Sequence, residues 1–310
     1  MKKLLAILLA GTMALSLTAC GGSTKGTEAA ATNAAAETDG GAAKAADTKA
    51  ADEAAKGADA AGELTGRLKA IKEAGVLKVA TSPDYPPYEF EDITKDGQEK
   101  YVGADMELAK YIADKLGVKL QIEAMAFDAC MAAIGQGRVD LTICGMVPKE
   151  ERKTTMDFSD VYYNDGNQVI VILKEDADKY KTLADFAGKS VAAQNGTLQY
   201  DLVTTQISDA KCEVVSAVTD GIMMLKTGKV AGIALASVAA DNYLANYPDL
   251  VECDEKFDYT SLGVVAGVVK NEPEFLAEIN GIVKEVADSE IYYQWIDEAS
   301  QLSNEIQGVK

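Results

Sequence analysis

Arg152 is the residue whose type and position first suggest chemistry in this sequence. It lies in the stretch CGMVPKEERKTTMDFSDVYY (residues 144–163) and is one of three arginines among 30 basic residues. The planar guanidinium group of arginine binds a carboxylate through two parallel hydrogen bonds, whereas lysine offers a compact point charge. Arg152 is therefore a candidate anion-binding residue. A surface ion pair with Glu150 or Glu151 is the alternative.

Enzymatic chemistry has little support in the composition. The chain contains no histidine, so it lacks the most common general base and the most common zinc ligand. It also lacks a P-loop, a GxSxG elbow and a GxGxxG fingerprint. We therefore expect a binding protein, not an enzyme, with no metal and no cofactor. The net charge of −19 argues against nucleic acid and anionic lipid headgroups as partners.

The first 20 residues, MKKLLAILLAGTMALSLTAC, have the order of a lipoprotein export signal. Two lysines precede an apolar run of signal-peptide length, and small residues lead to Cys20. This order predicts that residues 1–19 are removed and that a lipid is attached to the thiol of Cys20; an ordinary signal peptide with an incidental cysteine is the alternative. No later stretch is long and apolar enough to cross a bilayer, so we expect an extracytoplasmic protein that is lipid-anchored to the cell membrane.

Residues 20–63 are expected to form a disordered tether. They consist mainly of Ala, Gly, Thr, Asp, Glu and Lys and contain no aromatic residue. A segment of this composition cannot bury a core. It would hold the folded part of the chain close to the membrane.

Four further cysteines are spaced without a CxxC motif. Disulfides are common in exported proteins, but these cysteines lie singly in apolar segments, which fits buried free thiols equally well. Both states stay open at this point, with free thiols slightly favoured. The four residues are Cys130, Cys144, Cys212 and Cys253.

Strands and helices alternate along the rest of the chain, which predicts parallel βαβ units. Residues 105–117 give the clearest helix signal, with acidic residues in the first turn, an apolar face and Gly117 after the last turn. A second alternating set begins near Gln168, so we expect an α/β fold with two lobes, each a mostly parallel sheet flanked by helices. The expected strands are residues 76–81, 120–125, 139–146, 169–173, 190–196, 212–217, 232–236 and 262–269.

The chain is expected to pass between the lobes twice. If the last helices return to the first lobe, residues 64–165 and 262–310 form lobe 1 and residues 166–261 form lobe 2. The two connecting strands would then act as a hinge. Ligands of open α/β sheets bind beyond the carboxyl ends of the strands, so we expect a site between the lobes. The loops at those ends are residues 82–90, 126–128, 145–152, 195–198 and 236–237.

The sequences of these loops resemble the bacterial extracellular solute-binding proteins of family 3, which are polar amino-acid receptors of ABC importers. The resemblance runs from about Leu64 to the C-terminus, and the block from GRVDLTICGM to DFSDVYY is its most specific part. It implies a type II periplasmic-binding-protein-like fold that closes around its ligand. The matching stretches are SPDYPPYEF, GADMELAKYIADKLG, FDACMAAIGQGRVDLTICGM, EERKTTMDFSDVYY, LADFAGKSVAAQNGT and LKTGKVAGIAL.

The resemblance implies how the carboxylate of an amino-acid ligand would be held. Arg152 would bind the α-carboxylate. Backbone N–H groups would assist it at Val147 and at Thr197 and Leu198, which open a helix where anions are favoured.

The resemblance also implies contacts for the rest of the ligand. The carbonyl group of Gly145 would face the α-ammonium group. The rings of Tyr85 and Phe127 would enclose the ligand side chain, and core packing is the alternative role for Phe127.

Three positions depart from the pattern of the family. Val147 stands where Ser or Thr is usual, Ala236 stands where Asp usually pairs with the α-ammonium group, and Ser82 stands where some members place Asp. The ammonium anchors are therefore missing while the carboxylate anchor is kept. Burying an ammonium group without a partner costs several kcal/mol of free energy.

Two hypotheses about the ligand follow from these departures. In the first, the ligand is a small carboxylate without an ordinary α-ammonium group, and an aromatic or apolar carboxylate is one such ligand. In the second, it is an ordinary amino acid whose ammonium group is held elsewhere, by Asp84 or Asp165, by water or by Ser237. The sequence leaves both open.

The expected function is that of a monomeric substrate-binding lipoprotein of an ABC importer. It would capture an amino acid or a related small carboxylate between its lobes and deliver it to a membrane permease with its ATPase. A cyclohexadienyl-type dehydratase and a ligand-sensing module on the same fold are the alternatives.

Overall fold

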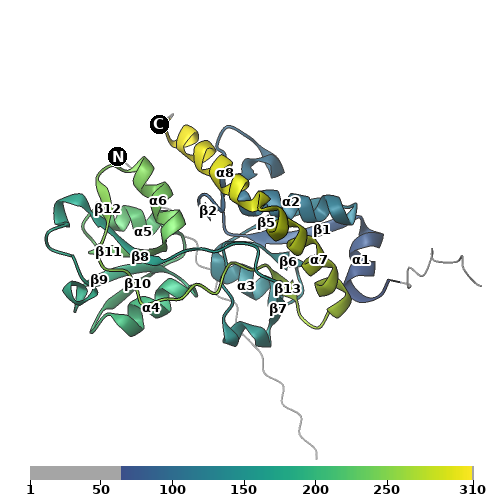
Figure 1. Cartoon of the computed structure of the whole chain (residues 1–310), viewed down its shortest axis with the longest axis horizontal. Helices are drawn as coiled ribbons and strands as arrows, with labels where there is room; N and C mark the ends of the chain where they lie inside the picture. Colours follow the sequence, from purple (N-terminus) through teal and green to yellow (C-terminus); the bar gives the residue numbers. More distant parts are fainter. Residues whose placement is uncertain (1–63, 309–310) are drawn as a thin grey trace, which may run out of the picture. The chain divides into compact units, whose positions relative to one another are not determined.

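The computed structural model of the protein describes residues 64–308. The expected signal peptide (1–19) and tether (20–63) lie outside the described residues. Within residues 64–308 the strands form two five-stranded sheets and one three-stranded sheet (Figure 1). None of the helices in this range combines the length and apolar character that a membrane crossing requires.

The first sheet belongs to lobe 1 and has the order β5-β1-β6-β13-β7. Strand β1 runs parallel to both β5 and β6, whereas β13 runs antiparallel to β6 and β7. The sheet is thus mixed, because β13 returns to it from the other lobe. Its strands are β1 (Val76–Thr81), β5 (Lys119–Ala124), β6 (Leu141–Thr142), β7 (Met156–Phe158) and β13 (Gly267–Val269).

The second sheet belongs to lobe 2 and has the order β10-β9-β11-β8-β12. Strand β9 runs parallel to β10 and β11, and β8 runs antiparallel to β11 and β12. Both lobes therefore combine a parallel half with an antiparallel half. The strands are β8 (Gln168–Leu173), β9 (Ser190–Gln194), β10 (Lys211–Val215), β11 (Gly232–Ala236) and β12 (Leu250–Glu252).

Helices cover both sheets, and a small antiparallel sheet lies beside the first one. The small sheet consists of β2 (Asp84–Tyr85), β3 (Glu89–Glu91) and β4 (Tyr101–Val102). The α-helices are α1 (Gly66–Ala74), α2 (Ala104–Leu116), α3 (Phe127–Gly135), α4 (Leu198–Gln206), α5 (Val218–Lys226), α6 (Ser237–Asn246), α7 (Pro273–Ser289) and α8 (Ile291–Gly308). The short 3-10 helices are η1 (Gly97–Lys100), η2 (Glu150–Thr154), η3 (Lys174–Asp176) and η4 (Leu183–Phe186).

The expected strand at residues 139–146 is much shorter in the structure. Strand β6 ends at Thr142, and Gly145 takes a φ of 58°, a conformation that glycine adopts without a steric penalty. The N–H group of Gly145 points away from the sheet and donates to the Asp105 carboxylate at 2.6 Å. The chain therefore leaves the sheet early and turns toward the space between the lobes.

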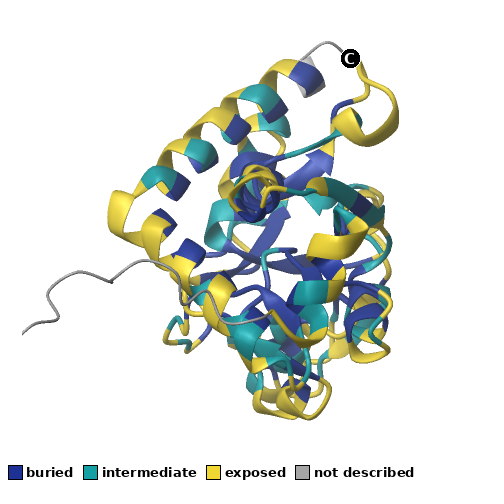
Figure 2. Ribbon diagram, turned by 90° about the vertical axis from the view of Figure 1, so that its right-hand side faces the viewer, coloured by how far each residue is buried: buried dark blue, intermediate teal, exposed yellow. Residues whose placement is uncertain are grey.

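Alternating residues of β8 show how the core of lobe 2 is divided. Val169 and Val171 pack in one buried cluster, and Ile170 and Ile172 pack in another. Successive side chains of a strand point to opposite faces of the sheet, so each face has its own core under helices. Figure 2, viewed from the side of lobe 1, shows buried strands beneath helices whose outer faces are exposed.

Two segments connect the lobes. The first runs from β7 to β8 and the second from β12 to β13, and they pair through an isolated antiparallel bridge between Tyr163 and Val264. The Val264 N–H group donates to the Tyr163 carbonyl at 2.8 Å, and the Tyr162 N–H group donates to the Val264 carbonyl at 3.0 Å. Two adjacent crossings of this kind form a hinge axis.

Helix α8 contacts both lobes. Near its start, Tyr292 is fully buried in the core of lobe 1. Toward its end, the Ser303 hydroxyl donates to Asn242 of α6 at 2.9 Å, and Asn246 of α6 donates to Asn304 at 2.8 Å. The helix therefore links lobe 1 to the outer helix of lobe 2.

Candidate functional site

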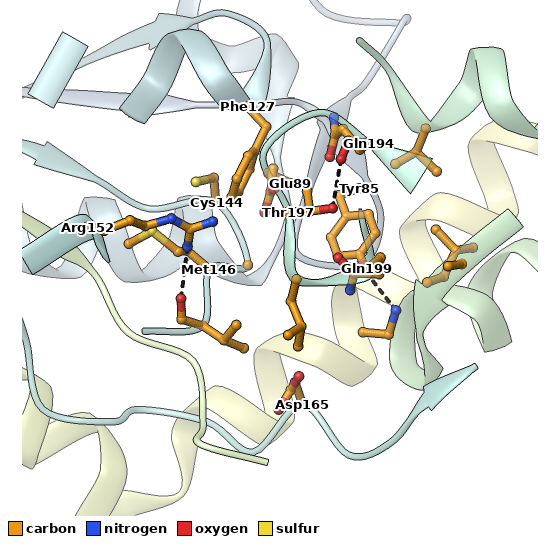
Figure 3. A pocket seen from close by; sticks show the side chains of 17 residues that line it. Tyr85, Glu89, Phe127, Cys144, Met146, Arg152, Asp165, Gln194, Thr197 and Gln199 are labelled. Carbon is orange, nitrogen blue, oxygen red and sulfur yellow. Dashed lines mark hydrogen bonds between the residues drawn. The ribbon is translucent and has the colours of Figure 1, made fainter. Parts of the chain in front are cut away.

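A cavity lies between the two lobes, beyond the carboxyl ends of strands in their five-stranded sheets (Figure 3). The space between its lining atoms, which is partly open to solvent, amounts to about 520 Å³. Its wall comes from both lobes and from the first crossing segment. The lining residues are Tyr85, Glu89, Phe127, Cys144, Gly145, Met146, Val147, Arg152, Asp165, Gln194, Thr197, Leu198, Gln199, Val218, Ala234, Leu235 and Ala236.

Most residues expected at the site line this cavity. Ser82 and Asp84 do not. The residues brought together as expected are Arg152, Tyr85, Phe127, Gly145, Val147, Thr197, Leu198 and Ala236.

Arg152 is buried with 7% of its surface exposed. Its guanidinium group donates to the Val147 carbonyl at 3.0 Å and, across the lobes, to the Gly196 carbonyl at 2.7 Å. It also lies 5.3 Å from the centre of the Phe127 ring, which is within cation–π distance. Burial lowers the pKa of Arg152 because the charged group is poorly solvated there.

Within the described part of the chain, Arg152 forms no ion pair, although the charges of Glu151 and Asp201 act on it from a distance. Glu150 and Glu151, its neighbours in sequence, instead form ion pairs with Lys153 at 2.5 Å and Lys149 at 2.7 Å. A buried cation without an ionic partner is costly. This arrangement fits a guanidinium group that is kept for an anionic ligand.

Helix α4 begins at the cavity. Thr197 is its N-cap residue, and its hydroxyl accepts a 3.4 Å hydrogen bond from the N–H group of Tyr200. The Thr197 N–H group makes a 3.4 Å contact with the Gln194 carbonyl. The remaining N–H groups at the helix start have no partner within the helix, which makes this end suitable for an anion.

Tyr85 joins the two lobes at the wall of the cavity. Its hydroxyl accepts a hydrogen bond from the Ala236 N–H group at 2.9 Å. Its ring stacks on Tyr88, with ring centres 5.6 Å apart and planes inclined by 12°. Ala236 therefore contributes its backbone N–H group to this interlobe contact and no carboxylate to the cavity wall.

Asp84 contacts lobe 2 outside the cavity. One carboxylate oxygen accepts from the Val218 N–H group at 2.6 Å and from the Gln194 amide at 3.0 Å. The other accepts from the Ser82 hydroxyl at 2.8 Å. Asp84 thus serves as an interlobe contact at the start of α5, and Ser82 supports it, so the geometry gives neither residue a direct path to a ligand.

Asp165 lines the cavity from the first crossing segment and is 2% exposed. It accepts hydrogen bonds from the Ser261 hydroxyl on the second crossing segment and from the Gln168 amide, the latter at 2.7 Å. Gln168 in turn accepts from Gln199 at 2.7 Å. This network links the hinge to the cavity wall.

Glu89 is a lining residue that the sequence analysis missed. It is 0% exposed, and among the described residues neither carboxyl oxygen has a hydrogen-bond partner. Burial, and then the neighbouring Asp105 carboxyl, raise the pKa of Glu89 well above its usual value. Figure 3 shows it with the other side chains of the cavity.

A signal for Glu89 was present in the expected loop SPDYPPYEF. Strands β2 and β3 pair Tyr85 with Glu89, so the two side chains share a face of the small sheet. The sequence alone predicts a ligand contact at Tyr85. Alternation along the strand places Glu89 opposite Phe90 and therefore on the side of Tyr85.

All four cysteines of the described region are free thiols. Cys144 lines the cavity, and its sulfur lies 3.4 Å from the hydroxyl of Thr142. The neighbouring Cys130 thiol, and then burial, raise the pKa of Cys144 well above its usual value. A thiol with so high a pKa is a weak nucleophile at neutral pH.

Comparison with known proteins agrees with this architecture. The family description "Bacterial extracellular solute-binding proteins, family 3" matches residues 77–298. The arginine-binding extracellular protein ArtP of Bacillus subtilis (strain 168) is 28% identical over 294 residues, which are 93% of this chain and 94% of that protein.

Two solved structures extend the comparison. The substrate-binding protein AbpA of an amino acid ABC transporter from Streptococcus pneumoniae, bound to L-arginine, is 30% identical with a TM-score of 0.72, covering 76% of this chain and 98% of that chain. The ancestral amino acid-binding protein AncCDT-1, a precursor of cyclohexadienyl dehydratase, is 28% identical with a TM-score of 0.66, covering 74% and 100%. The expected family and the two-lobed type II fold are confirmed. The chain belongs to the bacterial extracellular solute-binding proteins of family 3.

Proposed function

We propose that this protein is the substrate-binding component of an ABC importer and that its ligand is an amino acid with a cationic side chain. The observation that carries the proposal is the pair of buried groups without ionic partners, Arg152 and Glu89, on the wall of one cavity. A ligand that supplies both an anion and a cation satisfies both groups. Leaving either one unpaired costs free energy.

The charges of the lining residues narrow the ligand class. Among the described residues that line the cavity, Arg152 is the one cation, and Glu89 and Asp165 are the acidic side chains. The complementary ligand carries one carboxylate and two cationic groups, which is the charge pattern of arginine or lysine. ArtP and AbpA, which this chain resembles, are described with arginine.

This proposal chooses between the two ligand hypotheses. The α-ammonium group need not be absent, because Asp165 lines the same cavity and can take over the role of the missing aspartate at position 236, which leaves Glu89 for the side-chain cation. Asp84 is less suitable, since it does not line the cavity, whereas Asp165 does. The second hypothesis, an ordinary amino acid with a shifted ammonium contact, is therefore preferred.

A thermal-shift and calorimetry panel tests the ligand class. L-Arginine and L-lysine should raise the melting temperature, and a ligand at a hundred times its Kd adds about 2.7 kcal/mol to the free energy of unfolding. L-Citrulline has a neutral side chain, agmatine lacks the carboxylate, and the keto acid of arginine lacks the α-ammonium group, so each should bind much more weakly. Equal binding of L-citrulline and L-arginine would contradict the charge argument.

The cellular context is part of the same proposal. Cys20 would carry a lipid after removal of residues 1–19, and residues 20–63 would hold the binding lobes near a permease and its ATPase. Metabolic labelling with a fatty-acid analogue should modify the full chain and not the Cys20→Ala variant. Secretion of unlabelled wild-type protein into the medium would contradict the anchor.

The dehydratase alternative has a separate test. Incubation of the protein with a cyclohexadienyl acid should leave the acid unchanged, since the cavity contains no histidine and the relatives named above are binding proteins. Formation of the aromatic product by the wild type, and its loss in a Glu89→Gln variant, would favour the enzyme.

A further inference from the structure

A carboxyl group on the cavity wall, that of Glu89, has a second carboxyl group, that of Asp105, as its neighbour. Glu89 comes from β3, and Asp105 comes from the first turn of α2. Both side chains are fully buried. Each influences the titration of the other, through their charges and through a hydrogen bond that one proton would complete.

The two carboxyl groups differ in the hydrogen bonds that they accept. The Asp105 carboxylate accepts hydrogen bonds from the Tyr292 hydroxyl at 2.6 Å, the Tyr162 hydroxyl at 2.8 Å and the Gly145 N–H group at 2.6 Å. These donors stabilise the ionised form of Asp105 against the effect of burial. Glu89 accepts no hydrogen bond from any described residue.

When the pair of carboxyl groups holds one proton, Glu89 is therefore the protonated group and Asp105 is the ionised one. Two ionised carboxyl groups side by side in a dry site repel each other, and the group without hydrogen bonds is the one that becomes neutral. A neutral Glu89 can donate its proton to Asp105, which gives the otherwise unpaired carboxyl group a partner. The empty cavity then contains no unpaired buried anion at this position.

The other groups that face Glu89 do not favour its ionised form. Acidic and thiol groups near it add to the repulsion, and Arg152, on η2, is the one cation among the lining residues that the structure describes. The facing groups are Asp84 and Tyr85 on β2, Asp105 on α2, Cys144 after β6, Arg152 on η2, and Tyr162 and Asp165 on the first crossing segment.

We propose that Glu89 carries a proton while the cavity is empty and releases it when the cationic group of the ligand enters. The ligand cation then replaces the proton as the partner of Glu89, and binding frees about one proton into solvent. The inference rests on the proposed function, because only a cationic ligand removes the need for the proton. It deepens that function by making capture of the ligand dependent on pH.

The sign of the pH dependence follows from the same exchange. Below the pKa of Glu89 in the empty protein, the ligand must displace a proton, so its affinity rises as the pH rises. The rise is at most about tenfold per pH unit and ends above that pKa, where Glu89 is already ionised. Acidification should therefore release the ligand, and alkaline conditions should strengthen binding.

Titration calorimetry on the full chain with L-arginine tests the proposal. Runs at one near-neutral pH, in two buffers with different enthalpies of ionisation, give the number of protons released per ligand. We expect about one proton for the wild type and none for Glu89→Gln, whose side chain cannot ionise. The matched control is Glu252→Gln, because Glu252 is a partly buried carboxyl with a raised pKa that does not line the cavity; it should release the same number as the wild type.

Infrared spectroscopy of the wild type gives a second readout that does not depend on a variant folding. The carbonyl stretch of a protonated carboxyl group should be present in the empty protein at neutral pH and should disappear when L-arginine binds. Its absence from the empty protein, or its persistence after binding, would overturn the inference. So would binding of L-arginine without proton release over the whole pH range in which the protein is folded.

Failure of the proposed function has a different signature. If neither L-arginine nor L-lysine binds at any pH, the proposed ligand class is wrong and the proton exchange falls with it. If both bind and no proton is released, the ligand class stands and only the exchange is wrong.

Discussion

The two lobes contribute different kinds of groups to the cavity. Lobe 1 supplies charge and aromatic rings, through Arg152, Glu89, Tyr85 and Phe127. Lobe 2, as far as the described residues show, supplies neutral groups, among them the Gln199 amide, the start of α4 and the backbone of β11. Charged groups left unpaired dominate the free energy of binding, whereas neutral groups contribute shape and closure. We infer that lobe 1 determines which ligand binds and that lobe 2 determines how firmly it is enclosed.

The largest effect on ligand affinity is expected from Arg152, the cationic residue of lobe 1 that would bind the ligand carboxylate. Arg152→Ala should weaken L-arginine binding by about 3–5 kcal/mol, because the ligand carboxylate would be buried without a partner. Calorimetry should show a loss of about two to four orders of magnitude in affinity. The matched control is Arg138→Ala, which removes an exposed arginine of the same lobe; a similar loss in both variants would refute the assignment.

The second-largest effect on ligand affinity is expected from Glu89, the acidic residue of lobe 1 on the cavity wall. Glu89→Gln keeps the shape of the side chain and removes its ability to balance a cation. Binding of L-arginine should weaken by about 1–3 kcal/mol, while the weak binding of L-citrulline should change little. The quantity to measure by calorimetry is the ratio of the affinities for L-arginine and L-citrulline. Unchanged discrimination would mean that another group holds the cation.

A smaller effect is expected where the lobes meet outside the cavity. Asp84→Asn removes a negative charge from the start of α5, where it accepts from the Val218 N–H group, and this costs about 1 kcal/mol. Since the substitution destabilises only the closed form, it should lower affinity roughly fivefold through faster dissociation. Stopped-flow measurements separate the two rates. Asp220→Asn, in the exposed first turn of the same helix, should leave both rates unchanged.

The smallest effect is expected at the exposed edge of the lobe contact. Asn195 donates to Asp128 at 2.7 Å across the lobes, and both residues are exposed. Asn195→Ala should change affinity by at most about 0.5 kcal/mol. A double-mutant cycle with Asp128→Ala measures the coupling. A coupling as large as the effect of Asp84→Asn would show that closure is distributed over the whole interface.

Local signals in the sequence located several elements well. Strand β1 occupies the expected residues 76–81, and α2 (Ala104–Leu116) differs by one residue at each end from the expectation. Helix α2 ends because Gly117 takes a φ of 67°, with its N–H group bonded to the last turn. Such signals depend on neighbouring residues alone, so a sequence carries them fully.

Pairings between distant residues could not be predicted in the same way. Asp84 was a candidate for the ligand ammonium group, and its carboxylate meets the N–H group of Val218, which is 134 residues away. Glu89 was overlooked because its importance lies in a lack of partners, which only the packed structure reveals. The antiparallel direction of β8 and β13 likewise depends on how the chain enters each lobe from the crossing segments.

The contacts of α8 give the closing movement a consequence on the outer surface. This helix has 18 residues and is about 27 Å long, with its start fixed in lobe 1 and its end hydrogen-bonded to α6 of lobe 2. Any rotation of one lobe against the other must rearrange the seam between α6 and α8. The arrangement of α6 and α8 on the outer surface therefore depends on whether the lobes are open or closed. A second protein that binds these helices can distinguish the two states without contacting the ligand.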